Sequence, residues 1–288
     1  MAHDAADERA EIRAAVRGLC ERYPDAYWRE LDARSAYPAE FVEALTKAGW
    51  LAALIPTEFG GGGLGIADAC AVLEEINASG GNAAVAHAQM YTMASLLRHG
   101  SAEQKRRYLP RIAKGELRLQ AFGITEPDAG SETTRIATTA VRRGDTYVVS
   151  GQKVFISRAE HSDLMLLLAR TTRYEELSDK TEGLSLFLVD LDAGVKAGQI
   201  EIRPLETMMN HHSTQIFLRD LVVPASDRIG DEGRGFRYVI DSWNAERILI
   251  ASESIGDGGW FVDRASRYAS ERRVFGRAGI DHAATRAR

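Results

Sequence analysis

The segment AFGITEPDAGSET, residues 121–133, has the residue types of a binding loop rather than of a plain connection. Three hydroxyl side chains, those of Thr125, Ser131 and Thr133, are spaced around a proline and two glycines at the end of a short apolar run. Small hydroxyls can both donate and accept hydrogen bonds. A glycine-broken turn that carries them at fixed offsets is therefore a candidate ligand site.

A second candidate is an acidic residue in an apolar surrounding, Glu246 in SWNAERILIA. Its neighbours on the predicted helix are mostly apolar: Trp243, Ala245, Ile248, Leu249 and Ile250. Burial of a carboxyl group in such surroundings raises its pKa and makes it a stronger base. The alternative interpretation is that Glu246 forms a structural ion pair with a nearby basic residue.

The composition is that of a soluble globular protein with enough apolar material for a sizeable core. Of the 288 residues, 45% are hydrophobic and 27% charged, with a net charge of −5. The absence of a basic excess argues against nucleic-acid binding. No segment approaches the roughly 20 apolar residues of a membrane-spanning helix, and the N-terminus does not resemble a signal peptide. The two cysteines, Cys20 and Cys70, are expected to be reduced thiols, which predicts a cytoplasmic protein.

The hydrophobic period changes twice along the chain. Apolar residues recur at helical spacing up to about residue 115, strand-like alternation follows from about 120 to 225, and helical spacing returns after Gly235. We therefore predict three domains: helical over 1–118, a small β-barrel or sandwich over 119–231, and helical over 232–288. The fold class is α+β and multidomain.

Local signals give more detailed predictions. Pro38 should lie near a helix start, and Ser101 with Gln104 should form a capping box. Pro110 should break or kink its helix. Within the strand-rich part, turns are expected at residues 144–145 and 150–151.

Two patterns do not indicate a site. GGGGLG, residues 60–65, formally fits the dinucleotide fingerprint, but no buried strand precedes it, so it is expected to be a turn. Neighbouring His211 and His212 point in different directions and lack a third ligand, so no metal is expected.

The chain resembles the acyl-CoA dehydrogenase family along nearly its whole length. ITEPDAGSE followed by GQKVFIS resembles the family's two flavin-contacting segments, and PTEFGGGGLG resembles its N-terminal loop. LVVPASDRIGDEGRGFRYVI resembles its crossover from strands to C-terminal helices. NAERILIASESIG and RYASERRVFGR resemble the first two of those helices. The resemblance implies an N-terminal α-domain, a central β-barrel and a C-terminal α-domain that is incomplete here.

The resemblance implies FAD as cofactor and names its contacts. Phe122, Ile124 and Thr125 should line the flavin ring, and Ser131 should contact the flavin tail or the CoA part of the substrate. Phe155 matches a position that is aromatic in the family, often Trp. Ser157 matches a position usually occupied by Thr, which bonds the flavin edge.

The implied reaction oxidises an acyl-CoA to its trans-2-enoyl form, with loss of a proton from Cα and a hydride from Cβ. Glu246 matches the catalytic base of the isovaleryl-type and long-chain-type branches. Asn244 and Arg247 match positions near the substrate entrance, although Arg247 also suits a structural ion pair.

Arg272 and Phe275 match contacts to the flavin of a neighbouring subunit, which implies a homodimer or homotetramer. Arg272 also suits a solvated helix end. An electron-transferring flavoprotein is the implied electron acceptor.

After VFGR the chain departs from the family pattern, and it is expected to lack two further helices. Two alternatives therefore stay open. One is a flavin monooxygenase or acyl-CoA oxidase on the same fold, and the other is a non-catalytic truncated product. The length and branching of the acyl group are not readable from the sequence.

Overall fold

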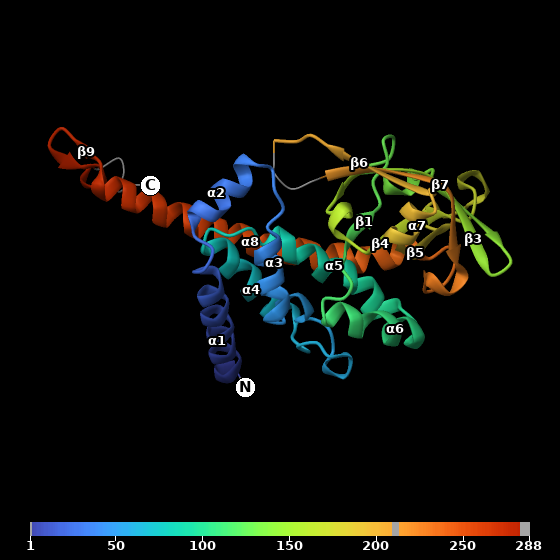
Figure 1. Cartoon of the computed structure of the whole chain (residues 1–288), viewed down its shortest axis with the longest axis horizontal. Helices are drawn as coiled ribbons and strands as arrows, with labels where there is room; N and C mark the ends of the chain where they lie inside the picture. Colours follow the sequence, from blue (N-terminus) through green and yellow to red (C-terminus); the bar gives the residue numbers. More distant parts are fainter. Residues whose placement is uncertain (1, 209–212, 283–288) are drawn as a thin grey trace.

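The chain folds as helices, then strands, then one long helix, as the period changes predicted (Figure 1). The computed structural model describes residues 2–208 and 213–282, so His211 and His212 lie outside it. The helices are α1 (Ala2–Cys20), α2 (Asp25–Ala33), α3 (Ala39–Lys47), α4 (Ile66–Ala78), α5 (Ala84–His99), α6 (Ala102–Ala113), α7 (Leu191–Lys196) and α8 (Gly235–Glu271). The strands are β1 (Leu119–Gly123), β2 (Thr139–Arg143), β3 (Thr146–Ser157), β4 (Leu164–Arg170), β5 (Leu184–Asp190), β6 (Ile200–Leu205), β7 (Ser213–Pro224), β8 (Arg228–Ile229), β9 (Arg273–Val274) and β10 (Arg277–Ala278).

The N-terminal helices begin and end close to their sequence signals. Pro38 directly precedes α3, and the capping box of α6 is confirmed by reciprocal bonds of Ser101 and Gln104, at 3.1 and 2.9 Å. The predicted break at Pro110 is wrong, because α6 continues through it to Ala113. Pro110 lies in the last turn of α6, so only one short stretch of helix follows it.

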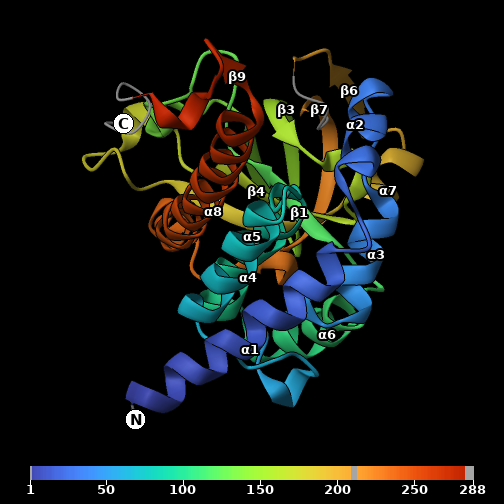
Figure 2. The same cartoon turned by 90° about the vertical axis from the view of Figure 1, so that its left-hand side faces the viewer.

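Helix α8 joins the helical part of the chain to the sheet. Figures 1 and 2 show it crossing α4 and α5 and reaching the sheet at its N-terminal end. The crossing with α4 is close, because a Cβ at Gly256 would lie 2.2 Å from the carbonyl oxygen of Glu74. At the other end, α8 carries the β9–β10 hairpin away from the sheet (Figure 1). No described helix is long and apolar enough to cross a membrane.

The central strands form one sheet that is not closed into the predicted barrel. Its order is β6-β7-β3-β2-β4-β5-β8, with β1 pairing in parallel with β4 outside this path. Among the described residues, the end strands β6 and β8 are not paired with each other. Strand β8 has only two residues, which keeps this edge short, and α8 contacts the neighbouring β5.

Strand β3 is long and irregular. A turn was predicted at Gly151, but β3 passes through it, with a shift in its register against β7. A Cβ at Gly151 would lie 2.3 Å from Thr138 Oγ1, so the glycine allows a close approach rather than a reversal. The predicted turn at Gly144 is confirmed and joins β2 to β3. Gly60–Gly65 form a turn before α4, and none of the described residues before them forms a strand.

Candidate functional site

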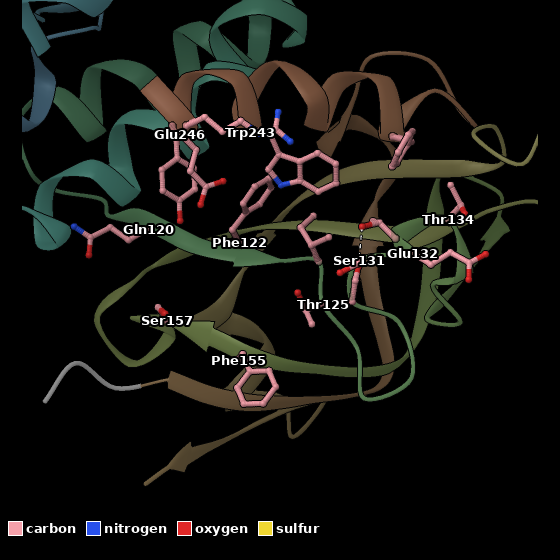
Figure 3. A pocket seen from close by; sticks show the side chains of 16 residues that line it. Gln120, Phe122, Thr125, Ser131, Glu132, Thr134, Phe155, Ser157, Trp243 and Glu246 are labelled. Carbon is pink, nitrogen blue, oxygen red and sulfur yellow. Dashed lines mark hydrogen bonds between the residues drawn. The ribbon is translucent and has the colours of Figure 1, made fainter. Parts of the chain in front are cut away.

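A pocket of about 640 Å³ lies between the end of β3, the loop after β1, and the first half of α8 (Figure 3). It collects most of the residues predicted as site residues from distant parts of the chain. Those lining it are Phe122, Ile124, Thr125, Ser131, Phe155, Ser157, Glu246 and Arg247. Tyr91, Gln120, Phe236 and Trp243 also line it and were not predicted as site residues.

The loop after β1 is fixed by a buried ion pair that the sequence analysis did not find. Lys153, on β3, is fully buried and its Nζ donates to Glu126 Oε1 at 2.8 Å and to the Ile124 carbonyl at 3.0 Å. Glu126 also accepts from the backbone N–H groups of Ala137 and Thr138, at 2.6 and 3.0 Å. One lysine thus ties the whole 124–138 loop to the strand behind it.

The pKa values of this pair follow from burial and mutual charge. Burial lowers the pKa of Lys153 to about 8, against the opposing effect of Glu126. Burial alone would raise the pKa of Glu126, but Lys153 and the backbone donors outweigh it and lower that pKa. Both groups are therefore charged from the lowered pKa of Glu126 up to about pH 8.

Phe155 is presented to the pocket by a strained backbone. Its φ of +58° is in the left-handed region, which bulky residues rarely occupy. The register of β3 against β7 shifts here, and the ring is left 66% exposed instead of joining the core. Strain at a functional position is common where a side chain must be aimed away from its regular direction.

Glu246 projects into the pocket from α8 (Figure 3). It is half-buried, and burial raises its pKa, while the neighbouring charge of Arg247 acts in the opposite direction. No ion pair within 4.0 Å joins Glu246 to any residue in the described part of the chain. The surrounding aromatic side chains include Tyr91, whose ring centroid lies 5.7 Å from that of Phe122.

Three predicted residues lie outside the pocket. Asn244 faces a separate groove on the other side of α8, and its Oδ1 accepts from Arg247 Nη1 at 3.1 Å. Arg272 and Phe275 lie at the far end of α8 and in the following hairpin, and both are exposed. They are thus remote from the pocket of their own chain (Figure 1).

The residues of the pocket fit a flavin ring. An exposed aromatic side chain, Phe155, provides a flat apolar contact, and the hydroxyl groups of Thr125 and Ser157 line the same pocket. Among the described residues, the one hydrogen-bond contact of the Ser157 hydroxyl is a long one, 3.5 Å to Ser213, so it is available to a ligand. A Cβ at Gly130 would meet nothing within 4 Å, so the loop leaves open space here.

Comparison with known proteins identifies domains of one family in all three parts of the chain. The models of the acyl-CoA dehydrogenase N-terminal, middle and C-terminal domains match residues 6–116, 121–221 and 233–288. FAD is the cofactor of this family.

Curated relatives match most of this chain. A cyclohex-1-ene-1-carbonyl-CoA dehydrogenase from Syntrophus aciditrophicus is 32% identical over 96% of this chain and 66% of its own length. A short-chain-specific acyl-CoA dehydrogenase from Clostridium acetobutylicum is 31% identical, over 94% of this chain and 70% of its own. The chain thus spans about two thirds of the length of these relatives.

Solved structures share the fold. A probable acyl-CoA dehydrogenase from Mycobacterium abscessus superposes with a TM-score of 0.87 at 29% identity, over 97% of this chain and 73% of that one. The acyl-CoA dehydrogenase from Geobacillus kaustophilus gives the same TM-score and coverage at 26% identity. The motifs, the pocket and these matches together lead to one conclusion: the chain belongs to the acyl-CoA dehydrogenase family.

Proposed function

We propose that this protein oxidises an acyl-CoA thioester to its trans-2-enoyl form, with FAD as cofactor and Glu246 as base. The position of Glu246 carries the proposal. Its half-buried carboxyl group lies across the open pocket from Phe155, Thr125 and Ser157 (Figure 3). A substrate between them would have the base on one side and the cofactor on the other.

Each residue has a defined task in this proposal. Glu246 takes the Cα proton, and its raised pKa brings its basicity closer to what the weakly acidic carbon requires. Bound FAD supplies the acceptor for the hydride that leaves Cβ. Phe155 would contact the face of the flavin ring, and Thr125 and Ser157 would hydrogen-bond its edge.

Two further pocket residues limit the access of water. Phe236 and Trp243 pack edge to face, with ring centroids 5.9 Å apart, beside Glu246. Apolar rings near the base preserve the desolvation on which its raised pKa depends. Ser131, exposed at the rim, contacts the flavin tail or the CoA portion of the substrate.

The partners are part of the proposal. Arg272 and Phe275, remote from their own pocket, would reach the flavin of a neighbouring subunit in a homodimer or homotetramer. An electron-transferring flavoprotein would reoxidise the flavin. One relative from Acetobacterium woodii, 33% identical, carries the name caffeyl-CoA reductase-Etf complex subunit CarC, which supports this choice.

The test is the visible spectrum of the FAD-loaded protein before and after anaerobic addition of acyl-CoAs. We expect bleaching of the flavin band by at least one thioester. Glu246→Gln should keep flavin binding and lose bleaching by at least about a hundredfold, the scale of general-base catalysis. Glu43→Gln, at an exposed position of α3, is the matched control and should bleach normally.

Undiminished bleaching in Glu246→Gln would refute the assignment of the base. Rapid reoxidation of the bleached protein by oxygen would instead favour an oxidase or monooxygenase. A protein that stays colourless after addition of FAD would favour a non-catalytic product.

A further inference from the structure

The outward face of helix α8 is apolar. Its inward face packs on α4 and α5, where Leu249 and Gly256 are buried. On the opposite side, Ile248, Ile255 and Val262 are 50, 64 and 67% exposed. The C-terminal part of α8 extends beyond the other helices (Figure 1), which leaves this face open in the described part of the chain. A helix on a protein surface normally turns polar residues outward, so this arrangement is inverted.

The exposed apolar residues follow a heptad repeat. Ile248, Ile255 and Val262 are seven residues apart and take the a position. Between residues 248 and 269 no charged residue stands at an a, d, e or g position, and the charges of this stretch all fall at b, c or f. The d positions carry small, exposed residues: Ala251, Gly258 and Ala265. Such a seam is typical of a helix that packs along another helix.

The face is large enough for an interface. Phe261 and Tyr268 border it at two g positions, and each is 64% exposed. Between residues 248 and 269 it runs for about 30 Å along the helix, at 1.5 Å per residue. With about 200 Å² for each aromatic side chain, the exposed apolar area comes to roughly 600 Å² per chain. This is at the upper limit for a patch on a monomer and approaches the share that each partner contributes to a standard interface.

A second copy of α8 has the length and the pattern to cover this face. Two helices pack closely when large residues on one face small residues on the other. In an antiparallel pair each a position faces a d position, whereas in a parallel pair like positions face each other and small residues would leave gaps. The antiparallel pair matches large with small throughout: Ile248 with Ala265, Ile255 with Gly258, and Val262 with Ala251 of the second copy.

The same register gives partners to the residues beside the seam. Arg247, at a g position, lies level with Tyr268 of the second copy, where its guanidinium can stack on the aromatic ring. Continued towards the end of α8, the register brings position 272 of one chain level with position 241 of the other. The hairpin with Arg272 and Phe275 therefore arrives near the turn of α8 where Trp243 lines the second copy's pocket. The heptad pattern thus leads to the place where the proposed function needs this hairpin.

We propose that two copies of this chain associate through the outward faces of their α8 helices, which run antiparallel about a two-fold axis between Ile255 and Gly258. The interface is isologous, because every contact occurs twice. The inference rests on the self-association in the proposed function and names the surface that forms it. It uses neither FAD nor the base Glu246, so the surface and the reaction are tested separately.

The first test is the oligomeric state, measured by sedimentation velocity over a range of protein concentrations, with and without FAD. We expect a dimer in wild type. Val262→Glu should weaken the association by at least about a hundredfold, because a carboxylate in an apolar seam loses its hydration. Val141→Glu, the same change at a 54% exposed position of β2, is the matched control and should stay dimeric. Urea unfolding should show that both variants are folded.

The second test concerns the direction and register of the helices. In the double variant Ala251→Cys/Val262→Cys, the thiols of two chains face each other in the antiparallel pair, so mild oxidation should link the chains. Within one chain the two positions are 11 residues apart on the same helix, or about 16 Å, which is too far for a disulfide. Ala251→Cys alone should not link chains, because position 251 faces itself only in a parallel pair. Wild type, with its own Cys20 and Cys70, is the blank.

A monomer at every concentration would overturn the proposal, as would large aggregates in place of a dimer. A dimer that Val262→Glu leaves unweakened, or that Ala251→Cys alone links as well as the double variant does, would also overturn it. A dimer without flavin bleaching would support the surface and reject the reaction. Bleaching by a monomeric protein would reject the surface and support the reaction.

Discussion

Removal of the Lys153 ammonium group should loosen the 124–138 loop and destabilise the whole protein. In Lys153→Met, Glu126 stays buried and charged, and the Ile124 carbonyl loses its donor. Removal of one partner from a buried pair costs about 3–5 kcal/mol. We expect the lower figure of about 3 kcal/mol, because two backbone N–H groups still hold Glu126. At this chain length, that corresponds to a fall in Tm of roughly 6–12 °C.

The measurement is urea unfolding of four proteins: wild type, Lys153→Met, Glu126→Gln and the double variant. The double variant should be more stable than the sum of the single changes predicts, by about 1 kcal/mol or more, since it leaves no unpaired charge. Lys47→Met, which breaks an exposed pair with Glu43, is the control and should change stability by less than about 0.5 kcal/mol. Strict additivity of the two buried changes, or a loss below 1 kcal/mol in Lys153→Met, would refute the reasoning.

The pH dependence gives an independent check on the same pair. The pKa of Lys153 is about 8 in the folded protein against an ordinary value of 10.5. Between these two values the unfolded chain binds more protons, so the free energy of unfolding rises with pH in this window. The stability difference between wild type and Lys153→Met should therefore widen from pH 8 to pH 10.5. A difference that narrows over this range would contradict the assignment.

Three further predictions concern the pocket and α8. Because burial raises the pKa of Glu246 above its ordinary 4.5, Glu246→Gln should be more stable than wild type at pH 8. That advantage should shrink as the pH falls through the raised pKa towards 4.5, as measured by chemical unfolding. Phe155→Gly should relieve the left-handed strain and stabilise the FAD-free protein by about 1 kcal/mol, while a fluorescence titration should show weaker FAD binding. Gly256→Ala should cost about 1–3 kcal/mol, because the new Cβ would clash with the carbonyl of Glu74, and Gly258→Ala, with open space around it, should be neutral or stabilising in the same thermal melts.

Much of the architecture could be predicted from the sequence because the relevant signals are local. Helical and strand periods, the capping box at Ser101 and the turn at Gly144 each depend on residues within a few positions of one another. The wrong predictions, a helix break at Pro110 and a turn at Gly151, also rest on local signals. At both positions the surrounding structure determined the backbone instead. The end of α6 made the proline tolerable, and Thr138 on another segment required the glycine.

The candidate site was predictable in its loop and its acidic residue, but not in the contacts that hold them. Glu126 and Lys153 are separated by 27 positions, and nothing in the sequence gives the register that brings their side chains together. The strained backbone of Phe155 depends on the register shift against β7. Tyr91 and Gln120 were not recognised, because the residues that line a pocket can be identified only once the fold is known.

Helix α8 connects the pocket to the distant hairpin as one continuous element. Glu246 lies 10 residues before Gly256 and Glu271 lies 15 residues after it, or about 15 and 22 Å at 1.5 Å per residue. If the close contact of Gly256 with α4 is the fulcrum, a displacement of about 3 Å at the hairpin end moves the base by about 2 Å. Misplacement of about 1 Å at a reacting centre can cost a hundredfold in rate. On this geometry, a contact that displaces the distant hairpin would also displace Glu246 within the pocket.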